Sequence, residues 1–368
     1  MERDKTAHRP GAEGNQALLW VLRGERLVPP PIWLMRQAGR YLPEYRQLRS
    51  QARSFLDFCY TPDMAVEATL QPIRRFDLDA AIIFSDILVV PDALGRTVAF
   101  REGEGPVLDP LSPEDPTPVL DEAALRTRLA PVYEAIGRTR AELPTQKELI
   151  GFAGAPWTLA CYMIDGRNRQ DRFAATRRFM SAAPEAFARL MDVLADAVVS
   201  HACNQIDAGA QAIQLFDSWA EILLDVEGDG EGDGEGKALR RWSVLPMRRI
   251  ADAIHEHRPG VPVIAFPRGV GRHFAHYAEG SAFAGISIDT SVSSSWAAAN
   301  LQNRVAVQGH LDNQTLLAGG DRLRGETESI LRALTGGPFI FNLAHGVLPQ
   351  TPPEHVAELV AIVRRFSA

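Results

Sequence analysis

Short apolar runs recur along the chain and alternate with stretches of helical periodicity. Each run is four or five residues long and lies between turn residues, and its apolar positions follow one another without strict alternation. Strands of this kind are buried on both faces of a parallel sheet. We therefore predict eight strands, at Ile32–Met35, Ala80–Phe84, Glu148–Phe152, Ala212–Phe216, Pro262–Phe266, Gly285–Ile288, Val305–Gln308 and Phe339–Asn342.

The stretches between these runs have the spacing of amphipathic helices. In Pro184–Ala208, for example, Leu190, Leu194 and Val198 recur every four residues on one face. Strands that alternate with helices indicate βαβ units, and eight units in one domain favour a closed (β/α)8 TIM barrel over an open sheet. We predict a single-domain α/β barrel over residues 15–368, preceded by a disordered tail at 1–14.

Composition and charge narrow the class of protein. The chain is 46% hydrophobic and 23% charged, as in an average globular protein. It shows no secretory signal after the polar start Met1–Lys5 and no apolar run near the ~20 residues of a membrane helix. Its three cysteines, Cys59, Cys161 and Cys203, are far apart, which indicates a reducing compartment. We expect a cytoplasmic protein that does not enter a membrane, and the net charge of −7 argues against a nucleic-acid partner.

One low-complexity segment, Glu227–Gly236, consists of alternating glycine and acidic residues. It is not a phosphate-binding P-loop, because Lys237 is followed by alanine and the leading glycine is missing. It is not a calcium loop, because Arg240 stands where the bidentate glutamate is required. The composition predicts a flexible acidic surface loop near residues 226–237.

The reactive groups of a (β/α)8 barrel stand just past the C-terminal ends of its strands, and we predict the site residues at these positions. The first strand is followed by Arg36-Gln-Ala-Gly-Arg40. Two guanidiniums four residues apart can each grip a carboxylate bidentately, and the glycine lets the backbone approach a ligand. The alternative is the start of a surface helix with two solvated arginines.

Asp86, His345, Tyr162 and Ser218 also follow predicted strands. Asp86 comes after a buried run, where a carboxylate needs partners to stay charged; it could be a general acid or base, a fixed anion or an N-cap. His345 could donate a proton, orient a ligand or be structural. Tyr162 and Ser218 are weak signals alone, and Ser218 lacks both a nucleophile elbow and an adjacent base.

Absent residues limit the chemistry. The cations are 36 arginines and only three lysines, and none of the lysines (Lys5, Lys147, Lys237) follows a predicted strand. This argues against Schiff-base and pyridoxal chemistry, and no glycine-rich dinucleotide fingerprint follows the first strand. His201-x-Cys203 has a spacing that zinc could use, but it falls on a predicted helix without a third ligand. We expect neither a cofactor nor a metal.

Longer motifs resemble those of the uroporphyrinogen decarboxylase family. The matching stretches are Pro31-Ile-Trp-Leu-Met-Arg-Gln-Ala-Gly-Arg-Tyr-Leu-Pro-Glu-Tyr-Arg46, Phe84-Ser-Asp-Ile-Leu88, Gly151-Phe-Ala-Gly-Ala-Pro-Trp-Thr-Leu-Ala-Cys-Tyr-Met-Ile-Asp-Gly166, Gly209–Trp219 and Asn342–Pro349. The resemblance runs from about residue 15 to the end of the chain. Matches of sixteen residues are far more specific than any single residue at a strand end.

This resemblance implies a homodimeric barrel that converts uroporphyrinogen III to coproporphyrinogen III in haem biosynthesis. Four acetate side chains become methyl groups without a metal or an organic cofactor. By motif position, the implied catalytic residues are Asp86, Arg36, Tyr162 and His345. The implied substrate-binding residues are Arg36, Gln37, Ala38, Gly39, Arg40, Asp86, Tyr162, Ser218 and His345.

The residue chemistry is compatible with this assignment. Loss of CO2 leaves an electron pair that needs a sink, and a pyrrole protonated on carbon can accept it. The Asp86 carboxylate would stabilise that cationic ring and accept its N–H bonds, while Arg36 and Arg40 would hold substrate carboxylates. A locally cationic pocket is required on this acidic protein, because the substrate carries eight carboxylates.

The chain departs from the family pattern in places, and two other functions stay open. The acidic glycine loop replaces an ordinary helical connection, His310 stands where relatives usually have asparagine, and Ala344 stands where glycine is usual. One rival is a zinc-dependent methyltransferase of the same superfamily, which needs His and Cys ligands at strand ends. The other is a non-catalytic tetrapyrrole-binding protein, in which Asp86 and Tyr162 would have no reason to accompany the arginines.

Overall fold

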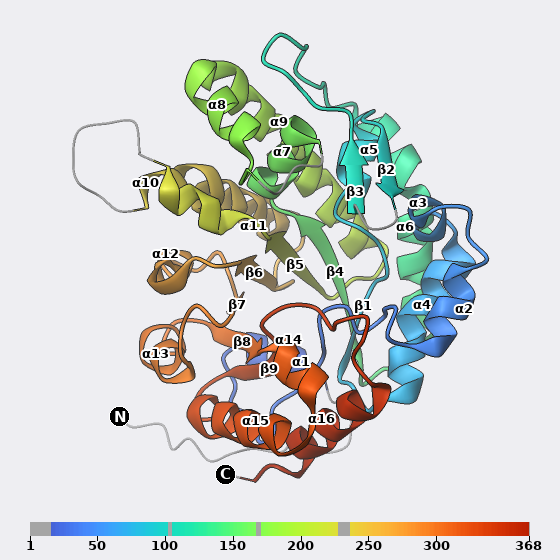
Figure 1. Cartoon of the computed structure of the whole chain (residues 1–368), viewed down its shortest axis with the longest axis vertical. Coiled ribbons are helices and arrows are strands. Elements are labelled where there is room, and N and C mark those ends of the chain that lie inside the picture. The colour runs from blue at the N-terminus through green and yellow to red at the C-terminus, as the bar shows by residue number, and fades with distance from the viewer. Residues whose placement is uncertain (1–15, 102–104, 167–170, 227–235, 368) are drawn as a thin grey trace.

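A curled sheet of seven parallel strands forms the centre of the molecule and is surrounded by helices (Figure 1). The computed structural model describes residues 16–101, 105–166, 171–226 and 236–367. All neighbouring strands of this sheet run parallel. In spatial order they are β1 (Ala80–Ile82), β4 (Glu148–Gly154), β5 (Ala212–Asp217), β6 (Val263–Pro267), β7 (Gly285–Ser287), β8 (Ala306–Leu311) and β9 (Phe339–Leu343).

The first predicted strand is not a regular strand, and this part of the prediction is wrong. Only Ile32 forms a bridge, to Phe341 of β9. On the other side, the Ile32 N–H donates to the Asp79 carboxylate at 2.6 Å and the Asp79 N–H donates to the Ile32 carbonyl at 2.9 Å. A ladder cannot extend from here, because the prolines before Ile32 lack N–H donors and Arg36 turns into the left-handed region at φ 59°. The segment still lies between β9 and β1, where it closes the ring.

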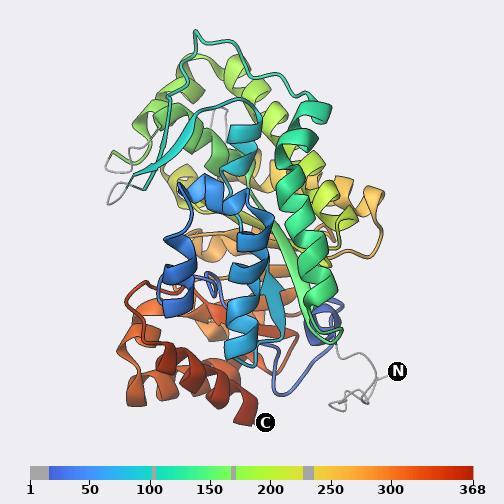
Figure 2. The same ribbon diagram turned by 90° about the vertical axis from the view of Figure 1, so that its right-hand side faces the viewer.

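Helices cover the outside of the ring, and α4 and α6 run side by side along it (Figure 2). The predicted helix at 184–208 is confirmed as α9. A two-stranded antiparallel hairpin, β2 (Val98–Arg101) with β3 (Gly105–Leu108), was not predicted. The helices are α1 (Ala17–Leu22), α2 (Pro43–Arg49), α3 (Phe55–Cys59), α4 (Pro62–Arg75), α5 (Val89–Ala93), α6 (Glu122–Glu142), α7 (Pro156–Asp165), α8 (Ala174–Ala182), α9 (Pro184–Asp207), α10 (Lys237–Leu239), α11 (Leu245–His257), α12 (Phe274–Tyr277), α13 (Ser294–Asn300), α14 (Asn313–Ala318), α15 (Gly320–Leu334) and α16 (Pro353–Arg365).

Helix α1 plugs the N-terminal end of the barrel. Leu18 and Leu22 pack in one buried cluster with side chains from the inner faces of β4, β5, β6, β8 and β9. A Cβ at Gly285 of β7 would lie only 2.8 Å from Leu22, so the plug requires a glycine there. The buried Glu148 carboxylate accepts bonds from the N–H groups of Leu18 (2.9 Å) and Leu19 (3.2 Å) in the first turn of α1. The opposite end, at the C-termini of the strands, is left as the mouth of the barrel.

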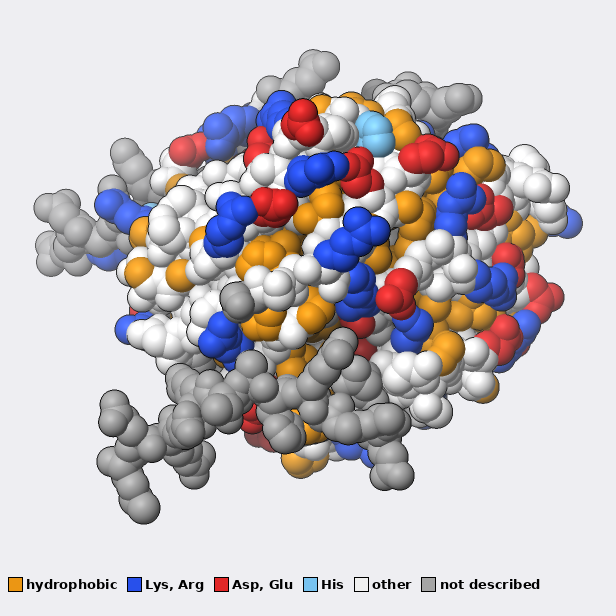
Figure 3. Space-filling view, turned by 90° about the horizontal axis from the view of Figure 1, so that it is seen from below, with side chains coloured by type: hydrophobic (Ala, Val, Ile, Leu, Met, Phe, Trp, Pro, Cys, Tyr) orange, Lys and Arg blue, Asp and Glu red, His pale blue; other side chains and the backbone are white. Residues whose placement is uncertain are grey.

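The surface carries charges of both signs. On the face at the bottom of Figure 1, acidic and basic side chains are interspersed among smaller apolar patches (Figure 3). Among the helices of the described ranges, none is long and apolar enough to cross a membrane. The predicted tail at 1–14 and most of the predicted acidic loop at 226–237 lie outside the described residues.

Candidate active site

Aromatic side chains line the barrel just below its mouth. Alternate residues of a strand point to the same face, and this places Phe152 of β4, Phe216 of β5 and Phe266 of β6 in the interior. The rings of Phe152 and Phe216 meet edge to face at 5.7 Å, and those of Phe216 and Phe266 at 6.0 Å. These rings form an apolar floor, above which the groups at the strand ends surround the site.

The segment from Arg36 to Arg40 forms a tight turn at this mouth. A Cβ at Gly39 would lie 3.0 Å from the Arg36 carbonyl, so a larger residue would press on the turn. The Arg36 side chain lies against Gly346, where a Cβ would come within 2.3 Å of its Cδ atom. Arg36 is therefore beside His345, although 309 residues separate them along the chain. The side chains of Arg36 and Arg40 are both exposed.

Gln37 and Ala38, between the two arginines, occupy different environments. Gln37 is fully buried; its side chain accepts from the Leu34 N–H at 3.0 Å and donates to the Ala80 carbonyl at 3.1 Å. The amide thus ties the turn to β1 by backbone contacts. Ala38 is half-buried.

The Asp86 carboxylate stands four residues past β1 and is partly buried. Burial raises the pKa of Asp86 to about 6, and this rise is opposed by the Leu88 N–H, which donates to Oδ1 at 2.8 Å, and by the Arg36 guanidinium. Asp86 is therefore ionised at neutral pH. The N-cap residue of α5 is Leu88 and not Asp86, so the N-cap alternative is wrong, although the bond from the Leu88 N–H ties Asp86 to the start of this helix.

Tyr162 lies in α7, the helix that follows β4, and Ser218 stands at the end of β5. Tyr162 is buried on α7, and its ring packs edge to face at 6.2 Å against both Trp219 and Phe173. Ser218 is half-buried directly after β5. The preceding residue, Asp217, accepts bonds from Thr158 and Ser243 and is fully buried, so it anchors the end of β5.

His345 follows β9 by two residues and is half-buried. Its Nδ1 atom accepts a hydrogen bond from the Gly346 N–H at 2.6 Å. An accepting Nδ1 carries no hydrogen, so the neutral ring has its N–H on Nε2.

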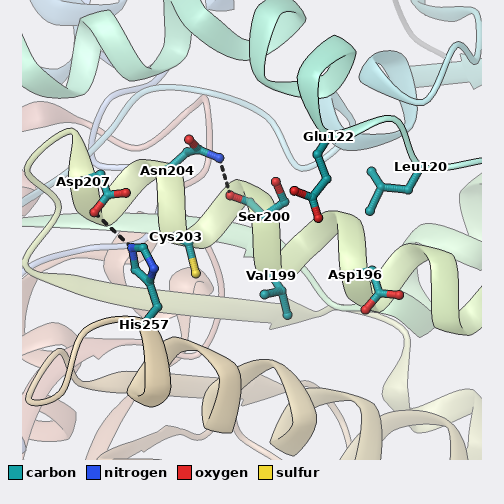
Figure 4. Close-up of a pocket in the computed structure, with 9 residues that line it drawn as sticks. All are labelled: Leu120, Glu122, Asp196, Val199, Ser200, Cys203, Asn204, Asp207 and His257. Carbon is teal, nitrogen blue, oxygen red and sulfur yellow. Dashed lines mark hydrogen bonds and ion pairs between the residues drawn. The ribbon is translucent and has the colours of Figure 1, made fainter.

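A separate pocket of about 370 Å³ lies on the outer surface, at α9 near the start of α6 and the end of α11 (Figure 4). It contains none of the predicted site residues. Its lining includes Cys203 and the ion-paired residues Asp207 and His257, whose Oδ1 and Nε2 atoms are 3.0 Å apart. None of its residues directly follows a strand of the barrel, whereas Asp86, Ser218 and His345 all lie just past the C-terminal ends of strands.

Within the described part of the chain, no group of three or more His, Cys, Asp and Glu side chains could hold a metal ion. The His201-x-Cys203 pair lies on α9, as expected. Burial lowers the pKa of His201 to about 3, and its Nδ1 atom is 3.1 Å from the Tyr133 hydroxyl. His201 is thus a neutral packing group.

Two more residues lie near the mouth: Arg268, which is not among the candidates predicted from the sequence, and His310, which follows a predicted strand but was given no role in the site. Arg268 directly follows β6, and its place two residues beyond Phe266 was the available signal. His310 lies in β8 and is buried; its Nε2 atom is 2.7 Å from the Ser294 hydroxyl, and burial lowers its pKa to about 4. His310 is therefore a neutral group beside the mouth.

A sequence-family model described as uroporphyrinogen decarboxylase matches residues 13–366. The chain belongs to the uroporphyrinogen decarboxylase family. The uroporphyrinogen decarboxylase of Rhodospirillum rubrum is 50% identical to it over 346 residues, which cover 94% of this chain and 96% of that protein. The uroporphyrinogen decarboxylase of Chelativorans sp. is 48% identical over 347 residues, which cover 94% and 97%.

Solved structures that are much less similar in sequence share the fold of this chain. A methyltransferase from Methanosarcina mazei superposes with a TM-score of 0.78 at 19% identity, over 96% of this chain and 99% of that chain. A B12-independent methionine synthase from Shewanella sp. gives a TM-score of 0.52 at 11% identity. At these identities the likeness establishes the single-domain barrel and not the reaction.

Proposed function

We propose that this chain is a uroporphyrinogen decarboxylase. It removes the four acetate carboxyls of uroporphyrinogen III as CO2 and yields coproporphyrinogen III in haem biosynthesis, without a metal or organic cofactor. The proposal is supported by relatives that carry this name and align over at least 94% of the chain. The structural observation that carries it is the partly buried Asp86 carboxylate next to Arg36 at the mouth of a plugged barrel.

The electron pair released with CO2 is accepted by the substrate itself. A pyrrole ring protonated on carbon is cationic, and it takes up the pair when the bond between the acetate methylene and its carboxylate breaks. A proton then adds to the methylene carbon to give the methyl group, and the proton on the ring carbon leaves. Asp86 stabilises the cationic ring and accepts its N–H bonds, because its charge lies close to the developing positive charge.

The remaining site residues bind and orient the substrate. Arg36 and Arg40 hold carboxylates at the exposed rim, and bidentate pairing makes guanidinium suited to this task. His345 stands beside Arg36 and orients a further carboxylate there. Tyr162 adds a buried aromatic wall, and Ser218 offers a hydroxyl at the end of β5.

In the proposed complex, the turn contacts the substrate mainly through its backbone. This applies to Gln37, Ala38 and Gly39. Gln37 uses both side-chain polar atoms within the protein, and Gly39 has no side chain. The turn therefore supports the two arginines and presents its own peptide groups to the ligand. The proposed site therefore consists of this turn and the four residues for which we propose a catalytic role, Asp86, Arg36, Tyr162 and His345.

We also propose that the enzyme is a cytoplasmic homodimer. This rests on the family resemblance. The absence of a membrane-spanning helix among the described residues is compatible with it.

An anaerobic assay of metal-stripped protein with uroporphyrinogen III tests the proposal. The products are oxidised and separated by carboxyl number. We expect a series from eight carboxyls to four. If folded protein binds the substrate and leaves it unchanged, the decarboxylase proposal is wrong and a tetrapyrrole-binding protein is favoured.

A second candidate function is that of a zinc-dependent methyltransferase, because a methyltransferase shares the barrel fold. That chemistry needs His and Cys ligands at the strand ends. In the described ranges the mouth carries His310 and His345, while Cys59, Cys161 and Cys203 all lie on helices or at their ends. Stoichiometric zinc in the purified protein, together with loss of activity on its removal, would favour this candidate.

A further inference from the structure

Arg268 differs from the other half-buried arginines of the described chain. Each of those, such as Arg140 and Arg248, has a hydrogen-bond or ion-pair partner for its guanidinium. Arg268 is half-buried, and its guanidinium has no such partner among the described residues. A cation withdrawn from water without a partner costs free energy, so the fold gives no structural reason for an arginine at this position.

The direction of β6 places Arg268 on the inner side of the barrel mouth. Ile264 and Phe266 belong to the buried cluster inside the barrel. Arg268 is the first turn residue after β6, and its N–H still donates to the Asp217 carbonyl of β5. The alternation of side chains along β6, continued by this bond, directs Arg268 to the same side as Phe266. It stands above the aromatic floor, where the other site groups stand.

The sheet order sets Arg268 opposite Arg36. The ring consists of seven strands and the closing segment at Ile32, which lies between β9 and β1. From this segment to β6 there are four steps through β1, β4 and β5, and four steps through β9, β8 and β7. The two arginines therefore approach the mouth from opposite walls.

The backbone around Arg268 is held in place. Its N–H donates to the Asp217 carbonyl at 3.0 Å, which positions it beside Ser218. The next residue, Gly269, donates its N–H to the Asp289 carboxylate and packs against the Glu221 side chain. Neither carboxylate comes within ion-pair distance of the Arg268 guanidinium in the described structure. The side chain is thus presented from a fixed loop while its charge stays available.

We propose that Arg268 is a further substrate-binding residue that pairs with a carboxylate on the side of the substrate opposite Arg36. This inference rests on the proposed decarboxylase function. A macrocycle with carboxylates around its whole rim needs cations on more than one wall of the site. Arg36 and Arg40 both project from one turn, and Arg268 supplies the opposite wall.

The test compares Arg268→Ala and Arg268→Lys with the control Arg304→Ala. Arg304 is exposed just before β8, at the plugged end of the barrel, so its removal makes the same change in net charge away from the mouth. For each protein we would measure kcat and KM with uroporphyrinogen III, the Kd for the oxidised probe uroporphyrin III, and the Tm.

We expect Arg268→Ala to weaken substrate and probe binding by about 10- to 100-fold, the effect of losing a charge-assisted pair. Arg268→Lys should recover part of this loss, and Arg304→Ala should bind like the wild type. The Tm of Arg268→Ala should not fall, since no internal partner is lost. Unchanged binding, or a lower Tm with unchanged KM, would overturn the proposal.

The same measurements separate this proposal from the function on which it rests. If the wild type binds the probe but releases no CO2, the decarboxylase proposal fails, and the comparison of probe affinities still tests Arg268. If the wild type is active and Arg268→Ala binds normally, only the role of Arg268 fails.

Discussion

At the scale of single residues, the proposed reaction depends most directly on the negative charge of Asp86, which stabilises the cationic pyrrole ring. The change Asp86→Asn keeps the shape of the side chain and removes its charge. Because a fixed charge at a transition state is worth several kcal/mol in a site shielded from water, we expect kcat to fall about 10²- to 10³-fold. Steady-state kinetics measure this, with Asp321→Asn on the exposed start of α15 as the control. Near-normal turnover of Asp86→Asn would remove Asp86 from the mechanism.

The titration of Asp86 gives a second prediction. Burial raises its pKa to about 6, and only the ionised form stabilises a cation. We expect log kcat/KM to fall with unit slope below about pH 6 and to be level above it until another group titrates. Arg36 lowers the pKa of Asp86, so Arg36→Ala should move this limb to higher pH. A limb that stays at the same pH in this variant would assign the titration to another group.

The sequence located several candidate residues correctly in the fold where a motif and a strand end coincide, while their roles in the site stay a prediction. Asp86, Ser218 and His345 all stand where the strand-end rule placed them. Arg268 also lies just past a predicted strand, Pro262–Phe266, but no motif marks it, so it was not chosen as a candidate. That its guanidinium has no partner among the residues the structure describes is a property of the folded protein, which a sequence does not display.

At the scale of secondary-structure elements, helix α1 depends on a carboxylate buried inside the barrel. Burial raises the pKa of Glu148 from an ordinary 4.5 to about 8, and the N–H groups of Leu18 and Leu19 oppose this rise. The folded state therefore binds the proton more tightly than the unfolded chain. This contribution to stability is fully present below pH 4.5 and is lost as pH rises through about 8.

The change Glu148→Gln keeps an oxygen acceptor for α1 and removes the charge. We expect the variant to be more stable than the wild type at pH 8 to 9, by no more than about 5 kcal/mol, since each pKa unit is worth about 1.4 kcal/mol. The difference should shrink toward pH 5. Urea unfolding at several pH values measures it, with Glu142→Gln at the exposed end of α6 as the control. A variant that is less stable at pH 8 would show that the charge helps to hold α1.

Elements differ in how far the sequence specifies them. The buried runs of β4 to β9 were predicted to within a few residues, because continuous apolar segments have few other places in a fold. The Ile32–Met35 run has the same apolar pattern, but prolines before it and the left-handed Arg36 after it prevent a ladder. The β2–β3 hairpin was missed because its strands are only four residues long and mostly partly exposed.

At the scale of the whole molecule, the net charge and the local charge of the site have opposite signs. The chain carries −7 overall, and the proposed substrate is a polyanion, so the overall field repels it. Arg36, Arg40 and, as proposed, Arg268 attract it at short range. Salt screens both the repulsion by the net charge and the attraction by these arginines, with a Debye length of about 10 Å at 0.1 M. Whether KM rises or falls with salt therefore shows which of the two dominates binding.

We expect KM for uroporphyrinogen III to rise severalfold between about 20 mM and 500 mM KCl, because direct carboxylate–guanidinium pairs weaken as salt screens them. The rise should be smaller in Arg40→Ala, which removes one pair from the exposed rim, and unchanged in Arg304→Ala at the plugged end. A KM that falls with salt would mean that repulsion by the acidic surface governs the encounter. In that case the mouth would not be the locally cationic site that binding of an octacarboxylate requires.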